Sequence, residues 1–225
     1  RLPITETSRI LDIGAGPGTL AIPFAERALS VTAVEPSPGM AEVMEEQARK
    51  ANLSNLTILQ KRWEDVEPET ELTEKFDIII ASYSLGMPDI SAAIDKMQMV
   101  SNGQIWLFWF AGTTSWEQHL KYLWPKIHNS PYEHGPKTDV LFNVLYQKGI
   151  YPNMTVHEMN HFKKYPDIEQ AVSEIKKQIG CSDEHDSIIR SYLADRLIPD
   201  GDSFIENGKT IRVCIWWDSN QFPKV

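Results

Sequence analysis

Apolar runs and amphipathic stretches alternate along the first half of the chain. Short apolar runs bounded by turn residues predict strands at 9–14, 30–35, 56–60, 76–82 and 104–110. The stretches at 18–29, 37–53 and 90–100 repeat apolar residues at helical spacing and therefore predict helices. Strands that alternate with helical crossovers are typical of a parallel sheet covered by helices on both faces, so we predict an α/β fold.

The second half of the chain has a different pattern. It predicts helices at 115–127, 138–148, 167–180 and 183–198, and strands at 153–162 and 209–217. The strand at 153–162 follows Gly149 and Pro152, which separate it from the preceding helix. We therefore expect the chain to change character near residue 112, with helices inserted ahead of the last strand.

The sequence LDIGAGPGTL, residues 11–20, joins the end of a predicted strand to the start of a helix. Its three glycines permit positive φ angles and a close approach of a ligand to the backbone, while the helix offers free N–H groups. The spacing is G-x-G-x-G, because Thr19 stands where dinucleotide-binding folds have their last glycine. Glu35 ends the next predicted strand, where a carboxylate can accept hydrogen bonds from both hydroxyls of a ribose. The alternative is a plain turn followed by a surface glutamate.

LDIGAGPGTLA and the following VTAVEPSPGM resemble the first two motifs of class I S-adenosylmethionine-dependent methyltransferases. ILQKRWEDV (58–66) resembles the adenine-contacting loop of that family, and FDIIIASYSLG (76–86) resembles the strand that faces the methyl group. The resemblance is clear over 9–111 and looser beyond. It implies S-adenosylmethionine as the cofactor and a Rossmann-like, seven-stranded, mostly parallel sheet with a helical insertion before the last strand. It also implies one domain over 1–225, with a cofactor-binding core at 1–111, substrate-side helices and an insertion at 112–208, and the last strand at 209–225.

The resemblance further implies roles for individual residues. Asp12 and the glycine-rich turn would line the methionine and ribose end of the cofactor, and Glu35 would hold the ribose hydroxyls. Tyr83 and its two neighbouring serines would border the sulfonium. Trp63, Glu64 or Asp65 would meet the adenine, although Trp63 is equally suited to the core. The predicted cofactor-binding residues are Asp12, Gly14, Ala15, Gly16, Gly18, Glu35, Pro36, Ser37, Met40, Trp63, Glu64, Asp65, Ser82 and Tyr83.

The predicted methyl acceptor is a small molecule. Family members that methylate exocyclic amines of nucleobases carry Asn/Asp-Pro-Pro-Tyr where this chain has ASYS at 81–84. Aromatic residues between 106 and 124 favour a flat or apolar acceptor, or one with a cationic amine. Methyl transfer needs mainly proximity and orientation, and needs a base only where the acceptor loses a proton. The candidate bases are Tyr83, His119, His128 and His134, of which we favour Tyr83 and His134 as catalytic residues.

Two other functions are compatible with the sequence. One is a methyltransferase-like protein that binds the cofactor without turnover, because catalysis of this kind needs few signature residues. The other is a nicotinamide-dependent oxidoreductase, against which the missing last glycine counts.

The segment His157-Glu158-Met159-Asn160-His161 matches the H-E-x-x-H pattern of zinc metalloproteases. On a helix, the two histidines would lie about 5–6 Å apart at Cβ and could bind one zinc ion. On a strand they would be about 13 Å apart, at ~3.3 Å per residue, and could not share an ion. The β-favouring residues before the motif predict a strand, so we expect no metal site here.

Composition narrows the possible partners and location. The net charge of −9 disfavours non-specific binding to nucleic acid or anionic membranes. Cys181 and Cys214 form no disulfide framework, and no signal-peptide pattern or long apolar segment is present, so we expect a cytoplasmic protein with no membrane partner. The oligomeric state is left open. The first residue is Arg1 rather than Met, which leaves room for a preceding segment of the kind that forms a lid in the resembled family.

Overall fold

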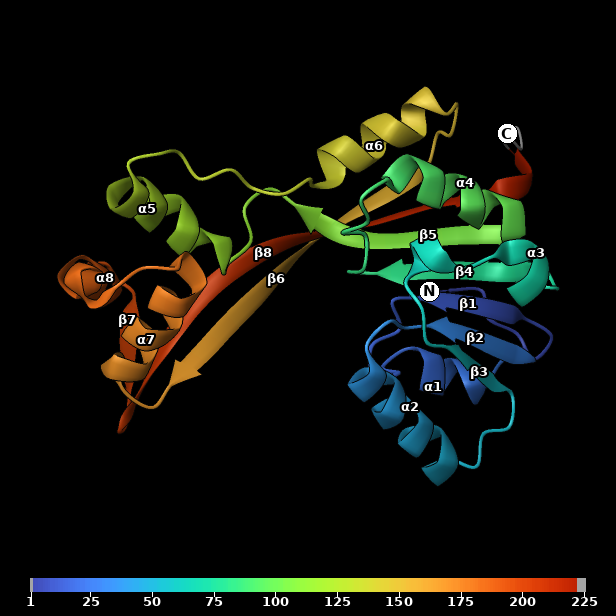
Figure 1. Cartoon of the computed structure of the whole chain (residues 1–225), viewed down its shortest axis with the longest axis horizontal. Helices are drawn as coiled ribbons and strands as arrows, with labels where there is room; N and C mark the ends of the chain where they lie inside the picture. The colour runs from blue at the N-terminus through green and yellow to red at the C-terminus, as the bar shows by residue number, and fades with distance from the viewer. Residues whose placement is uncertain (1, 222–225) are drawn as a thin grey trace. The chain divides into compact units, whose positions relative to one another are not determined.

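The computed structural model describes residues 2–221. Its strands form one sheet in the order β3-β2-β1-β4-β5-β8-β6, with the short β7 beside β8 (Figure 1). The pairs β2–β3, β1–β2, β1–β4 and β4–β5 are parallel, and β7–β8 is antiparallel. The prediction of a Rossmann-like, mostly parallel sheet is confirmed. The strands are β1 (Arg9–Ile13), β2 (Ser30–Val34), β3 (Leu56–Leu59), β4 (Phe76–Ser82), β5 (Ser101–Ala111), β6 (Asn153–Tyr165), β7 (Leu197–Asp200) and β8 (Ser203–Asp218).

Helices connect most of these strands. They are α1 (Ala21–Ala25), α2 (Pro38–Lys50), α3 (Pro68–Glu71), α4 (Ile90–Val100), α5 (Glu117–His128), α6 (Thr138–Gln147), α7 (Ile168–Ile179) and α8 (Asp186–Ala194). Three 3-10 turns complete the description: η1 (Trp63–Asp65), η2 (Asp183–His185) and η3 (Ser219–Gln221). No helix within residues 2–221 is long and apolar enough to cross a membrane.

The chain divides into two compact units, and the division falls within β5, β6 and β8 and directly before α6. The first unit comprises residues 1–109, 138–155 and 213–225, and the second comprises 110–137 and 156–212. We describe each unit by itself.

The first unit is built on β1, which pairs with β2 on one side and with β4 on the other. Ile10, for example, lies opposite Val31 of β2 and Ile78 of β4, and all three side chains are buried. Because these strands are parallel, their carboxyl ends lie at one edge of the sheet. The residues that follow them, from Gly14, Glu35 and Tyr83 onward, are therefore neighbours in space.

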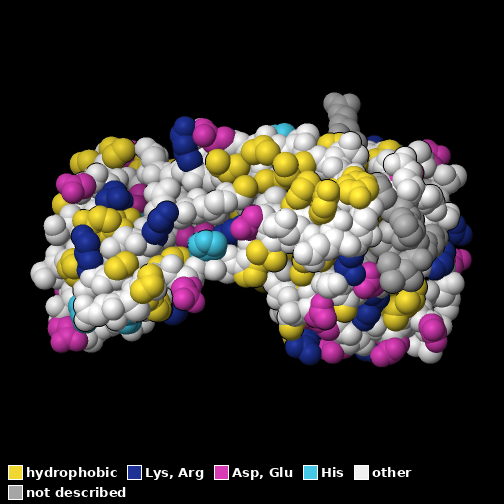
Figure 2. Space-filling view, turned by 90° about the horizontal axis from the view of Figure 1, so that it is seen from above, with side chains coloured by type: hydrophobic (Ala, Val, Ile, Leu, Met, Phe, Trp, Pro, Cys, Tyr) yellow, Lys and Arg dark blue, Asp and Glu magenta, His cyan; other side chains and the backbone are white. Residues whose placement is uncertain are grey.

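Hydrophobic side chains also remain on the surface of the first unit. Figure 2 views the side on which α6 lies in Figure 1, and shows hydrophobic side chains gathered there. Val140 and Tyr146 of α6 are exposed, and the Tyr146 ring meets the Tyr151 ring edge-on with the two centroids 5.3 Å apart, a separation typical of aromatic pairs. Lys148, just after α6, forms an ion pair with Asp95 of α4 and so ties the two helices together.

The second unit packs α5, α7 and α8 around a core of its own. Leu123 of α5, Val172 and Ile175 of α7, and Ile189 and Leu193 of α8 are all buried in this cluster. Asp167 caps α7 by accepting a hydrogen bond from the Gln170 N–H, and Gly180 ends the helix with a φ of 75°.

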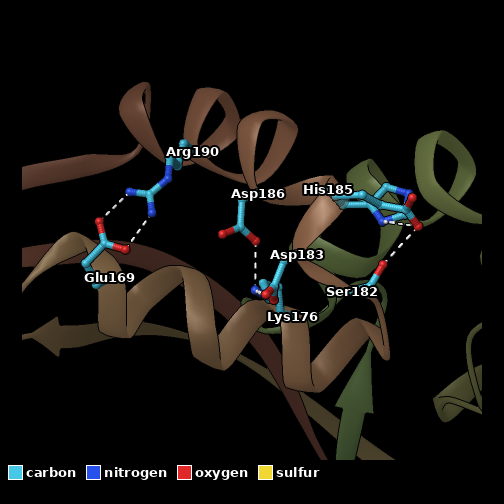
Figure 3. A network of polar contacts seen from close by, with 8 residues as sticks. Glu169, Lys176, Ser182, Asp183, His185, Asp186 and Arg190 are labelled. Atoms are coloured by element: carbon cyan, nitrogen blue, oxygen red, sulfur yellow. Dashed lines mark hydrogen bonds and ion pairs between the residues drawn. The ribbon is translucent and has the colours of Figure 1, made fainter.

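Ion pairs join α7 to η2 and α8 at the surface (Figure 3). The Arg190 guanidinium makes two hydrogen bonds to the Glu169 carboxylate, and the Lys176 ammonium contacts both Asp183 and Asp186. Solvent screens pairs at the surface, so the buried apolar contacts contribute more to this packing.

Two predicted helices differ from the structure. The helix predicted at 18–29 covers only Ala21–Ala25, because Gly18 adopts a φ of 86° and delays the first helical turn. The helix predicted at 183–198 ends at Ala194, and Leu197–Asp200 instead forms a hairpin with the start of β8. Pro199 cannot continue a helix, and Gly201, with a φ of 62°, lies in the turn between the paired strands. The last strand consequently begins at Ser203, before the predicted 209.

Candidate functional site

The glycine-rich turn connects β1 to α1 and is tied to the end of β2. Gly14, Gly16 and Gly18 all have positive φ angles, of 70°, 57° and 86°. The N–H groups of Gly14 and Ala15 both donate to the Val34 carbonyl, at 2.8 and 3.1 Å. The turn therefore follows a path that side chains with a Cβ rarely adopt, and its first residues are held against the neighbouring strand.

Glu35 is buried beside this turn. Its Oε2 accepts a hydrogen bond from the Gly16 N–H at 2.7 Å, and its Oε1 accepts one from the Ser37 N–H at 2.8 Å. A carboxylate oxygen has two lone pairs, so each oxygen retains a site for a further donor. Glu35 thus fixes the turn and keeps acceptor capacity for a ligand.

The turn is closely packed on one side and open on the other. A Cβ added to Gly14 would lie 2.3 Å from Cβ of Ser84, whose hydroxyl donates to the Ile13 carbonyl at 2.5 Å. A Cβ added to Gly16 would meet no atom within 4 Å. The open side at Gly16 is therefore where a ligand can approach the backbone.

Tyr83, directly after β4, adopts a left-handed conformation with a φ of 57°. Its N–H donates to the Phe108 carbonyl at 3.0 Å, which holds the backbone in this conformation. A left-handed residue other than glycine costs on the order of 1–2 kcal/mol. Strained residues of this kind concentrate at functional sites.

Two cavities meet at Gly14, which lines both. The larger measures about 350 Å³ and is lined by Asp12, Gly14, Ala15, Gly16, Pro17, Thr19, Leu20, Ser82 and Tyr83. The other measures about 330 Å³ and is lined by Ile13, Gly14, Val34, Glu35, Pro36, Arg62, Trp63, Glu64, Ser84, Gly86 and Met87. The structure thus brings most of the predicted site residues together at the carboxyl edge of β1, β2 and β4.

Four predicted residues do not line either cavity. Gly18 packs against α2, where an added Cβ would lie 2.7 Å from Cγ of Met44. Ser37 contributes its N–H to Glu35, and the side chain of Met40 is 46% exposed on α2. Asp65 is exposed and pairs with Arg62 through two hydrogen bonds, of 3.0 and 3.3 Å.

The cavities also include residues that the sequence analysis did not select. The most informative are Arg62, Gly86 and Met87. Arg62 directly precedes the 3-10 turn η1, and the other two follow β4. Arg62 and Gly86 lie within the recognised motifs at 58–66 and 76–86, and Met87 lies one residue beyond the second motif. Their position after strands that end at this edge could have identified them as candidate site residues.

Trp63 is a core residue whose ring also borders the cavity. It is only 3% exposed, and its indole N–H donates to the Ala93 carbonyl of α4 at 3.2 Å. The Lys96 ammonium donates to the carbonyls of Trp63, Glu64 and Val66, at 3.0, 2.9 and 2.8 Å. All three N–H donors of one lysine therefore attach η1 to α4.

Replacing Lys96 with methionine should loosen η1. The methionine keeps much of the apolar stem but leaves three carbonyls without their donor, at a cost of about 2–4 kcal/mol in the free energy of unfolding. Urea unfolding measures this cost, and calorimetry should show several-fold weaker binding of S-adenosylhomocysteine. Lys75→Met is the matched control, because the exposed Lys75 contacts a single carbonyl, that of Met99. Equal losses in the two variants would contradict this role for Lys96.

Asp12 is a buried carboxyl group in the larger cavity's lining. Among residues 2–221, its Oδ2 has no hydrogen-bond partner. Burial, and secondarily the nearby charge of Glu35, raise the pKa of Asp12 from 3.8 to about 7. A buried oxygen without a hydrogen-bond partner lowers the stability of the folded protein, unless a bound ligand supplies a donor. Oδ2 of Asp12 is therefore a candidate contact for a ligand.

The stability of the ligand-free protein should therefore fall as Asp12 ionises. Below pH about 4 the side chain is protonated in both the folded and unfolded chains, and between pH about 4 and about 7 only the folded chain holds the proton. The free energy of unfolding then decreases with rising pH, by on the order of 2–4 kcal/mol from this group. Asp12→Asn should lack this component, so its stability relative to the wild type should rise between pH 4 and 7 in urea unfolding. A pH-independent difference would refute the assignment.

The candidate histidines lie in the second unit. His134 is exposed and lines a cavity of about 130 Å³ with Gly112, Thr113, Glu117, Lys121 and Tyr132. Its Nδ1 lies 3.0 Å from the Gly135 carbonyl, and donation there leaves Nε2 as the basic nitrogen.

The other two histidines have structural partners. His119 is buried, its Nδ1 lies 3.2 Å from the Tyr192 hydroxyl, and its Nε2 lies 3.4 Å from the Glu206 carboxylate. Burial, with smaller effects of Lys163 and Arg196, lowers the pKa of His119 to about 4. His128 Nε2 is 3.2 Å from the Ile179 carbonyl and connects α5 to α7.

The H-E-x-x-H segment lies on β6, as predicted. Residues four apart on a strand are about 13 Å apart, so His157 and His161 of one chain do not converge on a single ion. Within the part of the chain that the structure describes, no group of three or more His, Cys, Asp and Glu residues is arranged to hold a metal ion.

Comparisons with known proteins agree with this geometry. Residues 10–102 match a family model described as a methyltransferase domain. A protein of Haemophilus influenzae described as uncharacterized is 26% identical over 220 residues, which cover 93% of this chain and 75% of that protein. The crystal structure of the YcgJ protein from Bacillus subtilis matches with a TM-score of 0.61 at 16% identity, covering 95% of this chain and 93% of that one. The ribosomal RNA small subunit methyltransferase G of Syntrophus aciditrophicus is 31% identical over 83 residues, which cover 36% of this chain and 34% of that enzyme.

Proposed function

We propose that this chain, whose residues 10–102 match a methyltransferase-domain model, is a class I S-adenosylmethionine-dependent methyltransferase. In this proposal it transfers a methyl group to a small-molecule acceptor at the carboxyl edge of β1, β2 and β4. The observation that carries the proposal is the pair of cavities that meet at Gly14, with the Glu35 carboxylate bonded to the turn between them. The family match also sets the nicotinamide oxidoreductase alternative aside.

The residues at this edge fit S-adenosylmethionine, the cofactor of the family. The open side of Gly16 accommodates a ligand against the backbone, and Glu35 has acceptor capacity for the ribose hydroxyls. The unpartnered Oδ2 of Asp12 suits the cationic amine of the methionine part. The cavity lined by Trp63 and Glu64 is the proposed adenine site.

The protein's own contribution is chiefly positioning. When bound, S-adenosylmethionine supplies an activated methyl group on a sulfonium. Asp12, Glu35 and the turn hold the two ends of the cofactor, while Ser82 and Tyr83 border the proposed methyl side through their place in the larger cavity. Tyr83, fixed by its N–H bond to Phe108, and His134, whose Nδ1 lies 3.0 Å from the Gly135 carbonyl, remain our proposed catalytic residues for an acceptor that must lose a proton.

Two observations favour a small-molecule acceptor over a nucleic acid. The chain carries ASYS at 81–84 rather than Asn/Asp-Pro-Pro-Tyr, and its net charge is −9. Binding to a phosphate backbone relies on clusters of Lys and Arg, which a strongly acidic protein disfavours. The ribosomal RNA methyltransferase is similar over only 36% of this chain, so its substrate does not transfer to this protein.

Calorimetric titration with S-adenosylhomocysteine tests the cofactor, with NADH as the negative control. Micromolar binding should then be followed by a screen of amine, hydroxyl and thiol compounds for methylation, with ribosomal RNA included as a competing acceptor. Methylation of a small molecule supports the proposal, and methylation of RNA alone refutes the acceptor class. Tight cofactor binding with transfer to no acceptor favours a binding role without turnover.

One variant for each residue tests the two proposed catalytic roles separately. Tyr83→Phe keeps the backbone and removes only the hydroxyl, and His134→Ala removes the imidazole. A residue that removes a proton should lower kcat and change its pH profile while leaving the affinity for S-adenosylhomocysteine unchanged. Unchanged kcat in both variants would show that no base from this pair is used.

A further inference from the structure

Strand β6 is an unusually long and exposed edge of the sheet. It stands at the end of the strand order, and among residues 2–221 no further strand pairs with its outer side. All of its residues from 153 to 164 are exposed, and only Tyr165 is buried. Within the second unit, Val156 is 58% and Phe162 is 72% exposed. A long, exposed edge strand presents unpaired backbone N–H and C=O groups and is a template for pairing with another chain.

We propose that β6 pairs antiparallel with β6 of a second copy of this chain, with Met159 at the two-fold axis. The resulting dimer extends the sheet across the axis and satisfies the outward backbone groups of both strands. This inference concerns assembly and does not depend on the proposed methyl transfer.

The register follows from the side chains of one face of β6. A two-fold axis perpendicular to the sheet continues each face of one strand into the same face of its partner. An even-numbered residue therefore lies opposite an even-numbered residue, and an odd-numbered residue opposite an odd-numbered one. With Met159 on the axis, Val156 lies opposite the partner's Phe162, and Glu158 lies opposite the partner's Asn160. The axis repeats each pair, so two Val–Phe contacts form across the interface. Each Glu158 carboxylate lies opposite an Asn160 amide that can donate a hydrogen bond to it.

The neighbouring registers are less favourable. A shift of two residues one way places Glu158 opposite the partner's Glu158, a like-charge pair that destabilises the strands. The same shift the other way places Val156 opposite the partner's Lys164 and Glu158 opposite the partner's Phe162. The sequence of β6 is therefore complementary to itself in one register, which is why we assign a second copy as the occupant.

The same register accounts for the H-E-x-x-H segment. His157 lies opposite the partner's His161, with Cβ atoms about 4.5–5.5 Å apart, although the two histidines of one strand are about 13 Å apart. The proposed dimer thus brings together two histidines that a single strand keeps apart.

Sedimentation of the wild-type protein over a range of concentrations tests the assembly. We expect a dimer, and Phe162→Glu should weaken it at least tenfold by placing a charge opposite the partner's Val156. Ile211→Glu is the matched control, because Ile211 is an exposed apolar residue on β8, an inner strand of the sheet. A wild-type protein that is monomeric at all concentrations overturns the proposal, as does a dimer that both variants weaken equally.

Single cysteines test the register, in a background carrying Cys181→Ser and Cys214→Ser. Met159→Cys places the two thiols opposite each other at the axis, whereas Asn160→Cys places each opposite the partner's Glu158. Oxidation to an intermolecular disulfide, which needs Cβ atoms about 3.5–4.5 Å apart, should therefore be several times faster in the first variant than in the second, with circular dichroism confirming that both are folded. Equal cross-linking rates would refute the register.

Discussion

Glu35→Ala should reduce the affinity for S-adenosylhomocysteine by about 100-fold or more. The variant loses the proposed acceptor for the ribose hydroxyls, and hydrogen bonds to a charged group contribute about 1.5–3 kcal/mol each. It also releases the N–H groups of Gly16 and Ser37, which the carboxylate now holds at 2.7 and 2.8 Å. Calorimetric titration measures the affinity, and urea unfolding should show a separate loss of stability from the freed turn.

Two controls separate these contributions. Glu42→Ala removes an exposed carboxylate from the same region of the chain, on α2, and should leave the affinity unchanged. Glu35→Gln keeps one acceptor oxygen but turns an amide donor toward a backbone N–H, so its affinity should be intermediate. Wild-type affinity in Glu35→Ala, with the protein folded, would show that the ribose is held elsewhere and would remove the basis of the proposed site.

Gly14→Ala should destabilise the protein by about 2–5 kcal/mol and weaken cofactor binding. The left-handed φ of 70° adds about 1–2 kcal/mol for any residue with a Cβ. The added methyl group would also lie 2.3 Å from Cβ of Ser84, and overpacking of this kind costs about 1–3 kcal/mol. Urea unfolding measures the sum.

A double variant distinguishes the clash from the backbone strain. Ser84→Gly removes the atoms that the new methyl group would meet, so Gly14→Ala should cost less in the Ser84→Gly background than in the wild type. Gly39→Ala serves as the control, because its φ is not positive and an added Cβ meets no atom within 4 Å. Gly39 lies in α2, where alanine should be neutral or stabilising. Identical costs of Gly14→Ala in both backgrounds would attribute the effect to backbone strain alone.

Much of the candidate site was predictable because its parts follow from local patterns. Apolar runs identified β1, β2 and β4, and parallel strands with helical crossovers end at one edge of a sheet. Residues placed directly after those runs, such as Gly14, Glu35 and Tyr83, must then be neighbours. The strand at β6 was likewise predictable, since its flanking break and β-favouring residues excluded the helix that a zinc site would need.

Other features depend on contacts between segments that are distant in the sequence. The hydroxyl of Ser84 reaches the Ile13 carbonyl, and the indole of Trp63 reaches Ala93, so neither the closed side of the turn nor the burial of Trp63 was visible in a local pattern. The burial of Asp12, and the lack of a hydrogen-bond partner for its Oδ2 among the described residues, likewise depend on the folded chain. The pairing of Leu197–Asp200 with β8 overrode a helix-like sequence, because a strand needs a partner that only the folded chain provides.

The amino-acid sequence by itself determined most of the strands and helices, the resemblance to a methyltransferase family, and the edge of the sheet where the candidate site residues gather. These depend on periodicity and on glycine chemistry, which act within a few residues. The tertiary structure alone decided which of those residues line the cavities, which oxygen atoms are already bonded and which edge strand is left unpaired. Those properties arise from packing, in which the position of each side chain depends on neighbours tens of residues away.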